Sequence, residues 1–156
     1  MDTASNPLLG SWQLRRWEIA YSDGRALTLP YGDAAVGLIV YAADGFMSAS
    51  IARAGRPPLS SESVRSAPEA ERLAAFESYF HYAGPYVLTR DAALPTGLRV
   101  AHHVTMSLNP NFVGSVQHRD VAFAADGMLT LSASDRLPGT EVARHHRLQW
   151  VRKVPT

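Results

Sequence analysis

A run of polar side chains interrupts a strand-like segment in the second half of the sequence. In SVQHRDVAFA, which begins at Ser115, Gln117 and Arg119 occupy alternate positions that continue into the apolar Val121. Because alternate residues of a β-strand share one face, the two polar side chains point the same way as the valine. An arginine buried without a partner is prohibitively costly, so Arg119 needs a carboxylate, a ligand anion or water. The run therefore predicts either a polar-lined cavity or an internal ion pair, for which Glu77 is the candidate partner.

The preceding segment, LRVAHHVTMSL, offers a histidine to the same cavity. Alternation puts His102 on one face with valine and methionine neighbours and places His103 on the other face. If the two segments pair through the Asn-Pro-Asn turn at 109–111, His102 faces the cavity together with Gln117 and Arg119. The structural alternative for His102 is a buried histidine that is hydrogen-bonded to a neighbouring strand or tyrosine.

Tyr82 and Tyr86 flank a predicted bend in the chain. Gly84 permits a sharp change of direction and Pro85 fixes its own φ, so both tyrosine rings could lie over the mouth of a cavity. Ordinary packing between helix and strand is the alternative for both tyrosines. We expect the groups that could act on a substrate to be His102, Arg119 and Tyr82, and the ligand contacts to be Gln117, Tyr86, Phe76, Phe80, Val104, Met106 and Val121.

These side chains suit two classes of function. A binding protein would hold a small, partly hydrophobic molecule whose acceptor or acidic group meets Arg119 and Gln117. A cofactor-independent isomerase, cyclase, hydratase or lyase would use His102 or a tyrosine to move a proton while Arg119 or Gln117 stabilises an oxyanion. Its substrate would be a small hydrophobic molecule such as a polyketide-like or terpenoid compound. Both classes stay open, with binding as the first choice.

The residues that other chemistries need are missing. The sequence has no Gly-x-Ser-x-Gly turn, phosphate-binding glycine loop, dinucleotide fingerprint or cysteine, so we expect no cofactor. The adjacent pairs His102-His103 and His145-His146 each split across the two faces of a strand, and no carboxylate is expected to face inward with them. We therefore expect no metal site.

The composition favours a single domain spanning residues 1–156. Fifteen lysines and arginines against fourteen aspartates and glutamates give a formal net charge of +1, and the basic residues are scattered. A nucleic-acid partner would need a clustered basic face, so we expect none. No stretch approaches the ~20 apolar residues of a membrane helix, and the N-terminus lacks the pattern of a signal peptide. We expect a cytoplasmic protein without a membrane partner.

The elements that position the candidate residues are mostly short strands. Strand patterns cover 11–21, two runs around the Asp44-Gly45 turn and five segments between Tyr86 and Arg152. Eight short strands joined by tight turns favour an all-β fold, a closed antiparallel up-and-down barrel, which has no free sheet edges. A barrel of this size can hold one small ligand.

One amphipathic helix is predicted near 68–80, between the third and fourth strands. Leu73, Phe76 and Phe80 recur at helical spacing and form one apolar stripe. We expect this stripe to face inward and cover one end of the barrel, because it must be buried somewhere. A homodimer contact is the alternative role for the stripe.

Six segments, taken in order, resemble the bacterial lipocalin-like domain family, a branch of the calycin barrels. They are LLGSW at 8–12, GLIVYAADGFMSASIAR at 37–53, YAGPY at 82–86, HHVTMSLNPNFVGSVQHR at 102–119, LTLSAS at 129–134 and LQWVR at 148–152. The resemblance implies a closed barrel with a ligand-sized interior and little about chemistry. It also implies that Trp12 packs at the closed end beneath Arg152, a cation–π contact that contributes about 0.5–2 kcal/mol.

Overall fold

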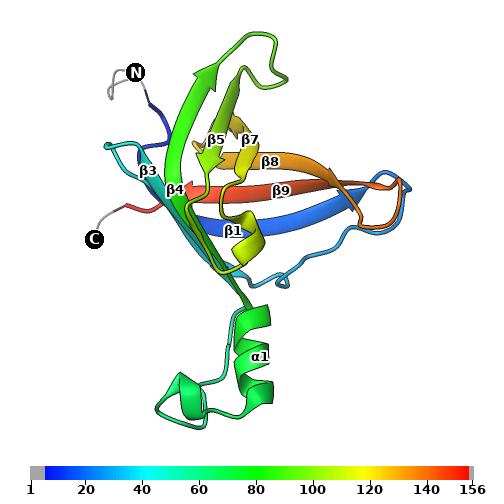
Figure 1. Ribbon diagram of the computed structural model, residues 1–156. Helices are drawn as coiled ribbons and strands as arrows, with labels where there is room; N and C mark the ends of the chain where they lie inside the picture. The colour runs from blue at the N-terminus through cyan, green and yellow to red at the C-terminus, as the bar shows by residue number, and fades with distance from the viewer. Residues whose placement is uncertain (1–5, 155–156) are drawn as a thin grey trace.

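Eight long antiparallel strands close into a barrel in the computed structural model, which describes residues 6–154 (Figure 1). They are β1 (Gly10–Tyr21), β2 (Val36–Tyr41), β3 (Phe46–Ala52), β4 (Tyr79–Arg90), β5 (Leu98–His103), β7 (Val116–Phe123), β8 (Leu129–Arg136) and β9 (Ala143–Arg152). Each strand pairs with its neighbours in the order β3-β2-β1-β9-β8-β7-β5-β4, and a β3–β4 pairing closes the ring. The predicted closed barrel is therefore confirmed.

The first and last strands are joined at one end of the barrel by the predicted aromatic–arginine contact. Trp12 and Arg152 are partners in the β1–β9 register, and the guanidinium carbon lies 4.2 Å from the centre of the indole. The Trp12 indole donates a hydrogen bond of 2.8 Å to the Leu8 carbonyl. Gly10 makes room for the guanidinium, because a Cβ there would lie 3.1 Å from Arg152 Nη1.

Two predicted turns form with the residues that the sequence indicated. Gly45 adopts φ +89 between β2 and β3, a conformation that glycine reaches without a Cβ clash. After β5, the side chain of Asn109 accepts a hydrogen bond from the Asn111 amide and begins a 3₁₀ turn, Pro110–Phe112. This turn leads into β7, which pairs with β5, so the expected pairing of the two polar segments is confirmed.

The segment from 98 to 108 does not continue as one strand. Where the chain leaves β5 it passes close to the backbone of β4 at Gly84, and a Cβ on this glycine would lie 1.9 Å from the His103 carbonyl oxygen. The register with β4 shifts by one residue between β5 and the two-residue strand β6 (Met106–Ser107), from Tyr86 opposite His102 to Ala83 opposite Met106, and this shift reverses the alternation. Met106 therefore points outward with 65% of its surface exposed, and its predicted inward position is wrong.

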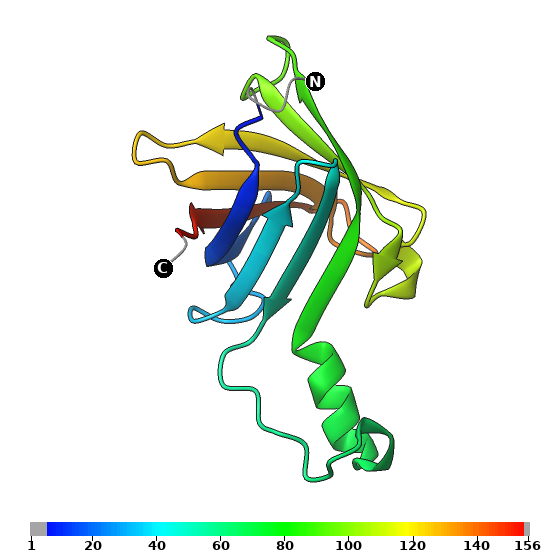
Figure 2. The ribbon, with the colours of Figure 1, turned by 90° about the vertical axis from the view of Figure 1, so that its left-hand side faces the viewer.

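The helix does not cover the barrel. A short 3₁₀ helix, η2 (Val64–Ser66), is followed by α1 (Glu69–Glu77), and the whole segment 53–78 projects away from the barrel in both views (Figures 1 and 2). We call residues 53–78 the projecting unit. Leu73 and Phe76 of its helix are 55% and 51% exposed, so the predicted inward position of these two residues is wrong.

The physical reason for this placement is the early start of β4. Helix α1 ends at Glu77, and Tyr79 already pairs with Ala52 of β3, so β4 continues directly from the helix into the sheet. A helix that runs straight into a strand at the barrel rim extends beyond the rim and cannot fold back over it. Arg56 instead joins the loop to the helix end, donating a hydrogen bond of 2.9 Å to the Ala75 carbonyl.

Among the described residues, no helix is both long enough and apolar enough to cross a membrane. The buried core lies inside the barrel. Its largest fully buried side chains are Trp12, Trp150, Tyr41, Leu8, Ile39, Leu129, His102, Val100 and Val121.

Candidate functional site

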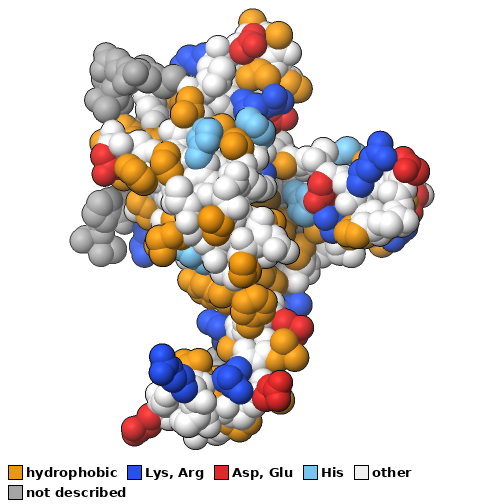
Figure 3. Space-filling view, in the orientation of Figure 1, with side chains coloured by type: hydrophobic (Ala, Val, Ile, Leu, Met, Phe, Trp, Pro, Cys, Tyr) orange, Lys and Arg blue, Asp and Glu red, His pale blue; other side chains and the backbone are white. Residues whose placement is uncertain are grey.

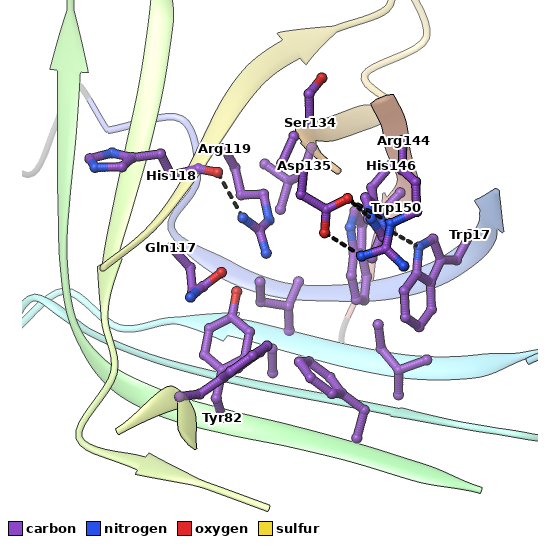
Figure 4. Close-up of a pocket in the computed structure, with 18 of the residues that line it drawn as sticks. Trp17, Tyr82, Gln117, His118, Arg119, Ser134, Asp135, Arg144, His146 and Trp150 are labelled. Carbon is purple, nitrogen blue, oxygen red and sulfur yellow. Dashed lines mark hydrogen bonds and ion pairs between the residues drawn. The ribbon is translucent and has the colours of Figure 1, made fainter. Parts of the chain in front are cut away.

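A cavity of about 490 Å³ occupies part of the barrel interior (Figure 4). Its aliphatic wall is formed by Ile39, Ala49, Ile51, Leu131 and Leu148. Its aromatic wall is formed by Trp17, Phe80, Tyr82, Phe112 and Trp150. The polar side chains that line it fall into two groups, one on β7 and one on β8 and β9.

The first polar group includes the two β7 residues that the sequence singled out. Gln117 and Arg119 are half-buried, line the cavity and point into it in Figure 4, as alternation predicted. Arg119 Nη1 donates a hydrogen bond of 2.7 Å to the His118 carbonyl. Within residues 6–154 Arg119 forms no salt bridge, so its guanidinium faces the cavity without a carboxylate partner.

The proposed internal partner of Arg119 does not meet it. Glu77 lies on α1 in the projecting unit, where it is exposed, and makes no ion pair with Arg119 in the described part of the chain. This hypothesis was wrong for the same reason as the covering helix. The Glu77 carboxylate lies beyond the rim of the barrel.

His102 is buried between two tyrosines. Its side chain is 1% exposed; Tyr41 Oη lies 2.8 Å from Nε2 and Tyr82 Oη lies 2.7 Å from Nδ1. Burial, as the largest cause, and the nearby positive charge of Arg119 together lower the pKa of His102 to about 3. The imidazole is therefore neutral at physiological pH.

The inward position of His102 is confirmed, but His102 does not itself line the cavity. Gln117 lies opposite it in the β5–β7 register, and of its two tyrosine partners only Tyr82 belongs to the cavity wall. The arrangement matches the alternative of a buried histidine bonded to tyrosine. The hydrogen bond from His102 to the cavity wall is the one to Tyr82.

The second polar group was missed in the sequence. Arg144 donates two hydrogen bonds, of 2.7 and 2.6 Å, to the carboxylate of Asp135, and His146 Nε2 lies 3.3 Å from the same carboxylate. The Trp17 indole donates to His146 Nδ1 at 3.4 Å. The expectation that no carboxylate faces inward was therefore wrong.

The protonation states in this second group follow from its contacts. Burial opposes ionisation of Asp135, but the hydrogen bonds from Arg144 and the charges beside it hold the pKa of the carboxyl below its usual range. Burial lowers the pKa of His146. Among the described residues, no three histidines, cysteines or carboxylates are grouped so as to hold a metal ion.

A signal for this second group was present in the sequence. Leu129, Leu131, Ala133 and Asp135 alternate along β8 and so share one face. On β9 the partners of these residues are Trp150, Leu148, His146 and Arg144. Extending the inward alternation of both strands by one more pair would have placed the ion pair at the cavity.

Comparison with known proteins identifies the fold family. The lipocalin-like domain matches residues 9–153 of the chain. The chain belongs to the lipocalin-like domain family. A 4'-hydroxy-3'-methoxypropiophenone carrier protein of Aspergillus oryzae, ppsC, is 32% identical over 110 residues, which cover 70% of this chain and 97% of that protein.

Five of the predicted ligand contacts lie outside the cavity of this lipocalin-like barrel: Tyr86, Phe76, Val104, Met106 and Val121. Val104 and Val121 belong to the buried core, and Phe76 and Met106 are exposed. Tyr86 donates to the Ala42 carbonyl at 3.0 Å and accepts a hydrogen bond from Asn6 at 2.9 Å. Phe80 and Gln117 do line the cavity, with Phe80 reaching it from β4 and not from the helix.

Proposed function

We propose that this lipocalin-like protein binds and carries a small, partly hydrophobic molecule inside its barrel. The molecule presents an acceptor or acidic group to Arg119 and Gln117. The observation that carries the proposal is the Arg119 guanidinium, which lines the cavity and has no carboxylate partner within residues 6–154. A charge in that position is stabilised by a ligand that supplies the missing acceptor.

The aromatic wall of the cavity favours a ligand with a flat ring. Phe80 packs edge-on against Tyr82 and Phe112, with ring centres 5.5 and 5.9 Å apart, and Trp17 lies 6.4 Å from Phe80. Such a wall presents ring faces and edges to a bound aromatic ring. The cavity volume of about 490 Å³ falls in the range typical of small-molecule sites, roughly 300–1,000 Å³.

The relative from Aspergillus oryzae supports the same class of ligand. Its name describes a carrier of an aromatic ketone with a hydroxyl and a methoxy group. A molecule of this kind combines a flat apolar body with oxygen acceptors, as the cavity requires. Both nitrogens of His102 already bond to tyrosines, which supports binding more than proton transfer by this histidine.

The proposal can be tested with 4'-hydroxy-3'-methoxypropiophenone as the probe. Trp17 and Trp150 line the cavity, so intrinsic fluorescence should report its occupancy in a titration. We expect saturable binding to the wild type and a loss of affinity of about 10–100-fold in Arg119→Leu, because a charge-assisted hydrogen bond is removed.

Arg99→Leu is the matched control for this experiment. Arg99 lies on β5, outside the cavity, where it pairs with Asp120 at 2.8 Å. Its replacement should leave the affinity unchanged. Equal affinities for wild type and Arg119→Leu would argue against Arg119 as the anchor, and the absence of saturable binding of this and related aromatic ketones would count against the proposed function.

A further inference from the structure

Tyr41, His102 and Tyr82 are joined by two hydrogen bonds, and the protonation of the imidazole limits which group donates in each. A neutral imidazole has one N–H donor and one bare nitrogen acceptor. Both nitrogens of His102 lie within hydrogen-bond distance of a tyrosine hydroxyl, 2.8 Å for Tyr41 and 2.7 Å for Tyr82. Consequently one tyrosine donates to the histidine and the other accepts from it.

Burial decides which tyrosine donates. The Tyr41 side chain is fully buried, and His102 is the only hydrogen-bond partner of its hydroxyl among residues 6–154. If the Tyr41 hydroxyl oxygen accepted a hydrogen bond from an Nε2–H, the Tyr41 O–H would be buried without an acceptor, which is costly. The Tyr41 hydroxyl therefore donates a hydrogen bond to Nε2. The imidazole proton is on Nδ1, and this N–H donates a hydrogen bond to the Tyr82 hydroxyl oxygen.

This order leaves the hydroxyl proton of Tyr82 without an acceptor in the described part of the protein. Tyr82 lines the cavity, so its O–H can donate only to something inside it. Figure 4 shows the Tyr82 hydroxyl and the Arg119 guanidinium directed toward one another across the same space. Burial raises the pKa of Tyr82, which keeps the hydroxyl protonated.

An independent observation points to the same kind of ligand. The indole N–H of Trp150, a residue that also lines the cavity, is buried and has no hydrogen-bond partner. Together with Tyr82 and Arg119, it adds a third donor group at the cavity wall that has no carboxylate partner within residues 6–154. A carbonyl oxygen, with two lone pairs and no proton, suits such a group of donors better than a hydroxyl does.

We propose that Tyr41 and His102 are positioning residues that make the Tyr82 hydroxyl a hydrogen-bond donor to the cavity, so that the ligand is selected for a carbonyl oxygen bound by Tyr82 and Arg119. This proposal rests on the proposed function and specifies the ligand class of the same site. It predicts that the barrel distinguishes a ketone from its methylene analogue.

The proton order can be tested without any ligand. In ¹⁵N-labelled protein at neutral pH, the side-chain correlations of His102 should show Nδ1 protonated and Nε2 bare. A proton on Nε2 would overturn the proposed order. Because this measurement uses the free protein, it decides the proton order even if no probe binds.

The ligand class is tested with a matched pair of probes. 4'-Hydroxy-3'-methoxypropiophenone and 2-methoxy-4-propylphenol differ only in a carbonyl that is replaced by a methylene group. The wild type should bind the ketone with about tenfold higher affinity, because the carbonyl oxygen accepts one or two hydrogen bonds that a methylene group cannot accept. Tyr82→Phe should lower the ratio of the two affinities to the part that Arg119 alone contributes, and Tyr41→Phe should also lower the ratio although Tyr41 does not line the cavity.

Tyr86→Phe is the control, because Tyr86 lies on the same strand as Tyr82 and its ring packs 4.9 Å from Tyr41, but it is outside the cavity. The affinity ratio of Tyr86→Phe should equal that of the wild type.

Equal binding of both probes to the wild type would overturn the ketone selection while leaving the proposed function standing. Failure of both probes and related aromatic ketones to bind would instead remove the proposed function. An unchanged ratio in Tyr41→Phe would overturn the positioning role.

Discussion

At the scale of single residues, burial and hydrogen bonding determine the states of the polar groups in the barrel. His102 is kept neutral because a charged imidazole would lose its hydration and lie near Arg119. Arg119 faces the cavity and forms no salt bridge within residues 6–154, while Asp135, which also lines the cavity, pairs with Arg144. His102 and Arg119 differ in role although the same alternation placed both inward: one belongs to the buried core and the other to the cavity wall.

The low pKa of His102 predicts how stability depends on pH. The unfolded chain binds a proton at His102 near pH 6.5 and the folded protein only near pH 3, so stability is lost as pH falls through this window. His102 should contribute a slope of about 1.4 kcal/mol per pH unit between these values. Urea unfolding at several pH values measures it.

His102→Gln provides the reference for this prediction, since glutamine keeps a donor and an acceptor and does not titrate. The difference in unfolding free energy between wild type and variant should shrink as pH falls from 6 toward 4. Parallel pH profiles for the two proteins would show that His102 titrates normally in the folded state.

At the scale of elements, the barrel depends on contacts that join distant parts of the chain. The β1–β9 pairing brings Trp12 beneath Arg152 and so ties the first strand to the last. The close approach of the chain after β5 to Gly84, with its one-residue register shift, turns Met106 out of the interior.

Removing the closed-end indole should weaken the whole barrel. Trp12→Ala deletes a fully buried ring and its contact with Arg152, so we expect a loss of about 3–5 kcal/mol in unfolding free energy. Thermal and urea unfolding provide the measurement. Unchanged stability would be incompatible with the observed packing of Trp12.

The close approach of the His103 carbonyl to Gly84 predicts a second large effect. A Cβ at this position would meet the His103 carbonyl oxygen at 1.9 Å, and backbone cannot move aside as a flexible side chain can. Gly84→Ala should therefore destabilise the protein by about 1–3 kcal/mol or more. Thr89→Ala, an exposed position on the same strand, should stay within about 0.5 kcal/mol of the wild type in the same urea titration.

At the scale of the whole molecule, the protein consists of a barrel that holds the cavity and a projecting unit that does not contribute to it. In Figure 3 the projecting unit carries basic, acidic and hydrophobic side chains next to one another. Its loop and helix are held together by contacts of Arg56 and of Glu71, which accepts a hydrogen bond of 2.8 Å from Ser60. The apolar side chains of α1 are largely exposed in the single chain.

The separation of the two parts predicts that the helix surface can be changed without affecting the barrel. The double variant Leu73→Ser/Phe76→Ser should change the unfolding free energy by no more than about 0.5 kcal/mol per site and leave ligand affinity unaltered, because both side chains are exposed. A large loss of stability would indicate that a second copy covers these residues, and sedimentation of the wild type would then show a dimer.

The sequence by itself determined the features that depend on neighbouring residues. Period-two alternation indicated which way His102, Gln117 and Arg119 point, because successive side chains of a strand face opposite sides whatever the strand pairs with. The Asp44-Gly45 turn followed from the backbone freedom of glycine. The closed barrel and the contact of Trp12 with Arg152 followed from strand counting and family resemblance.

The tertiary structure alone decided which inward residues meet one another. Asp135 and Arg144 form an ion pair at the cavity because the β8–β9 register places them opposite each other, and register depends on pairing over the whole strand. The helix leaves the barrel because Tyr79 pairs with β3 immediately after it. A stripe pattern shows that a helix has an apolar face, but only the closed sheet decides whether any surface remains for that face to cover.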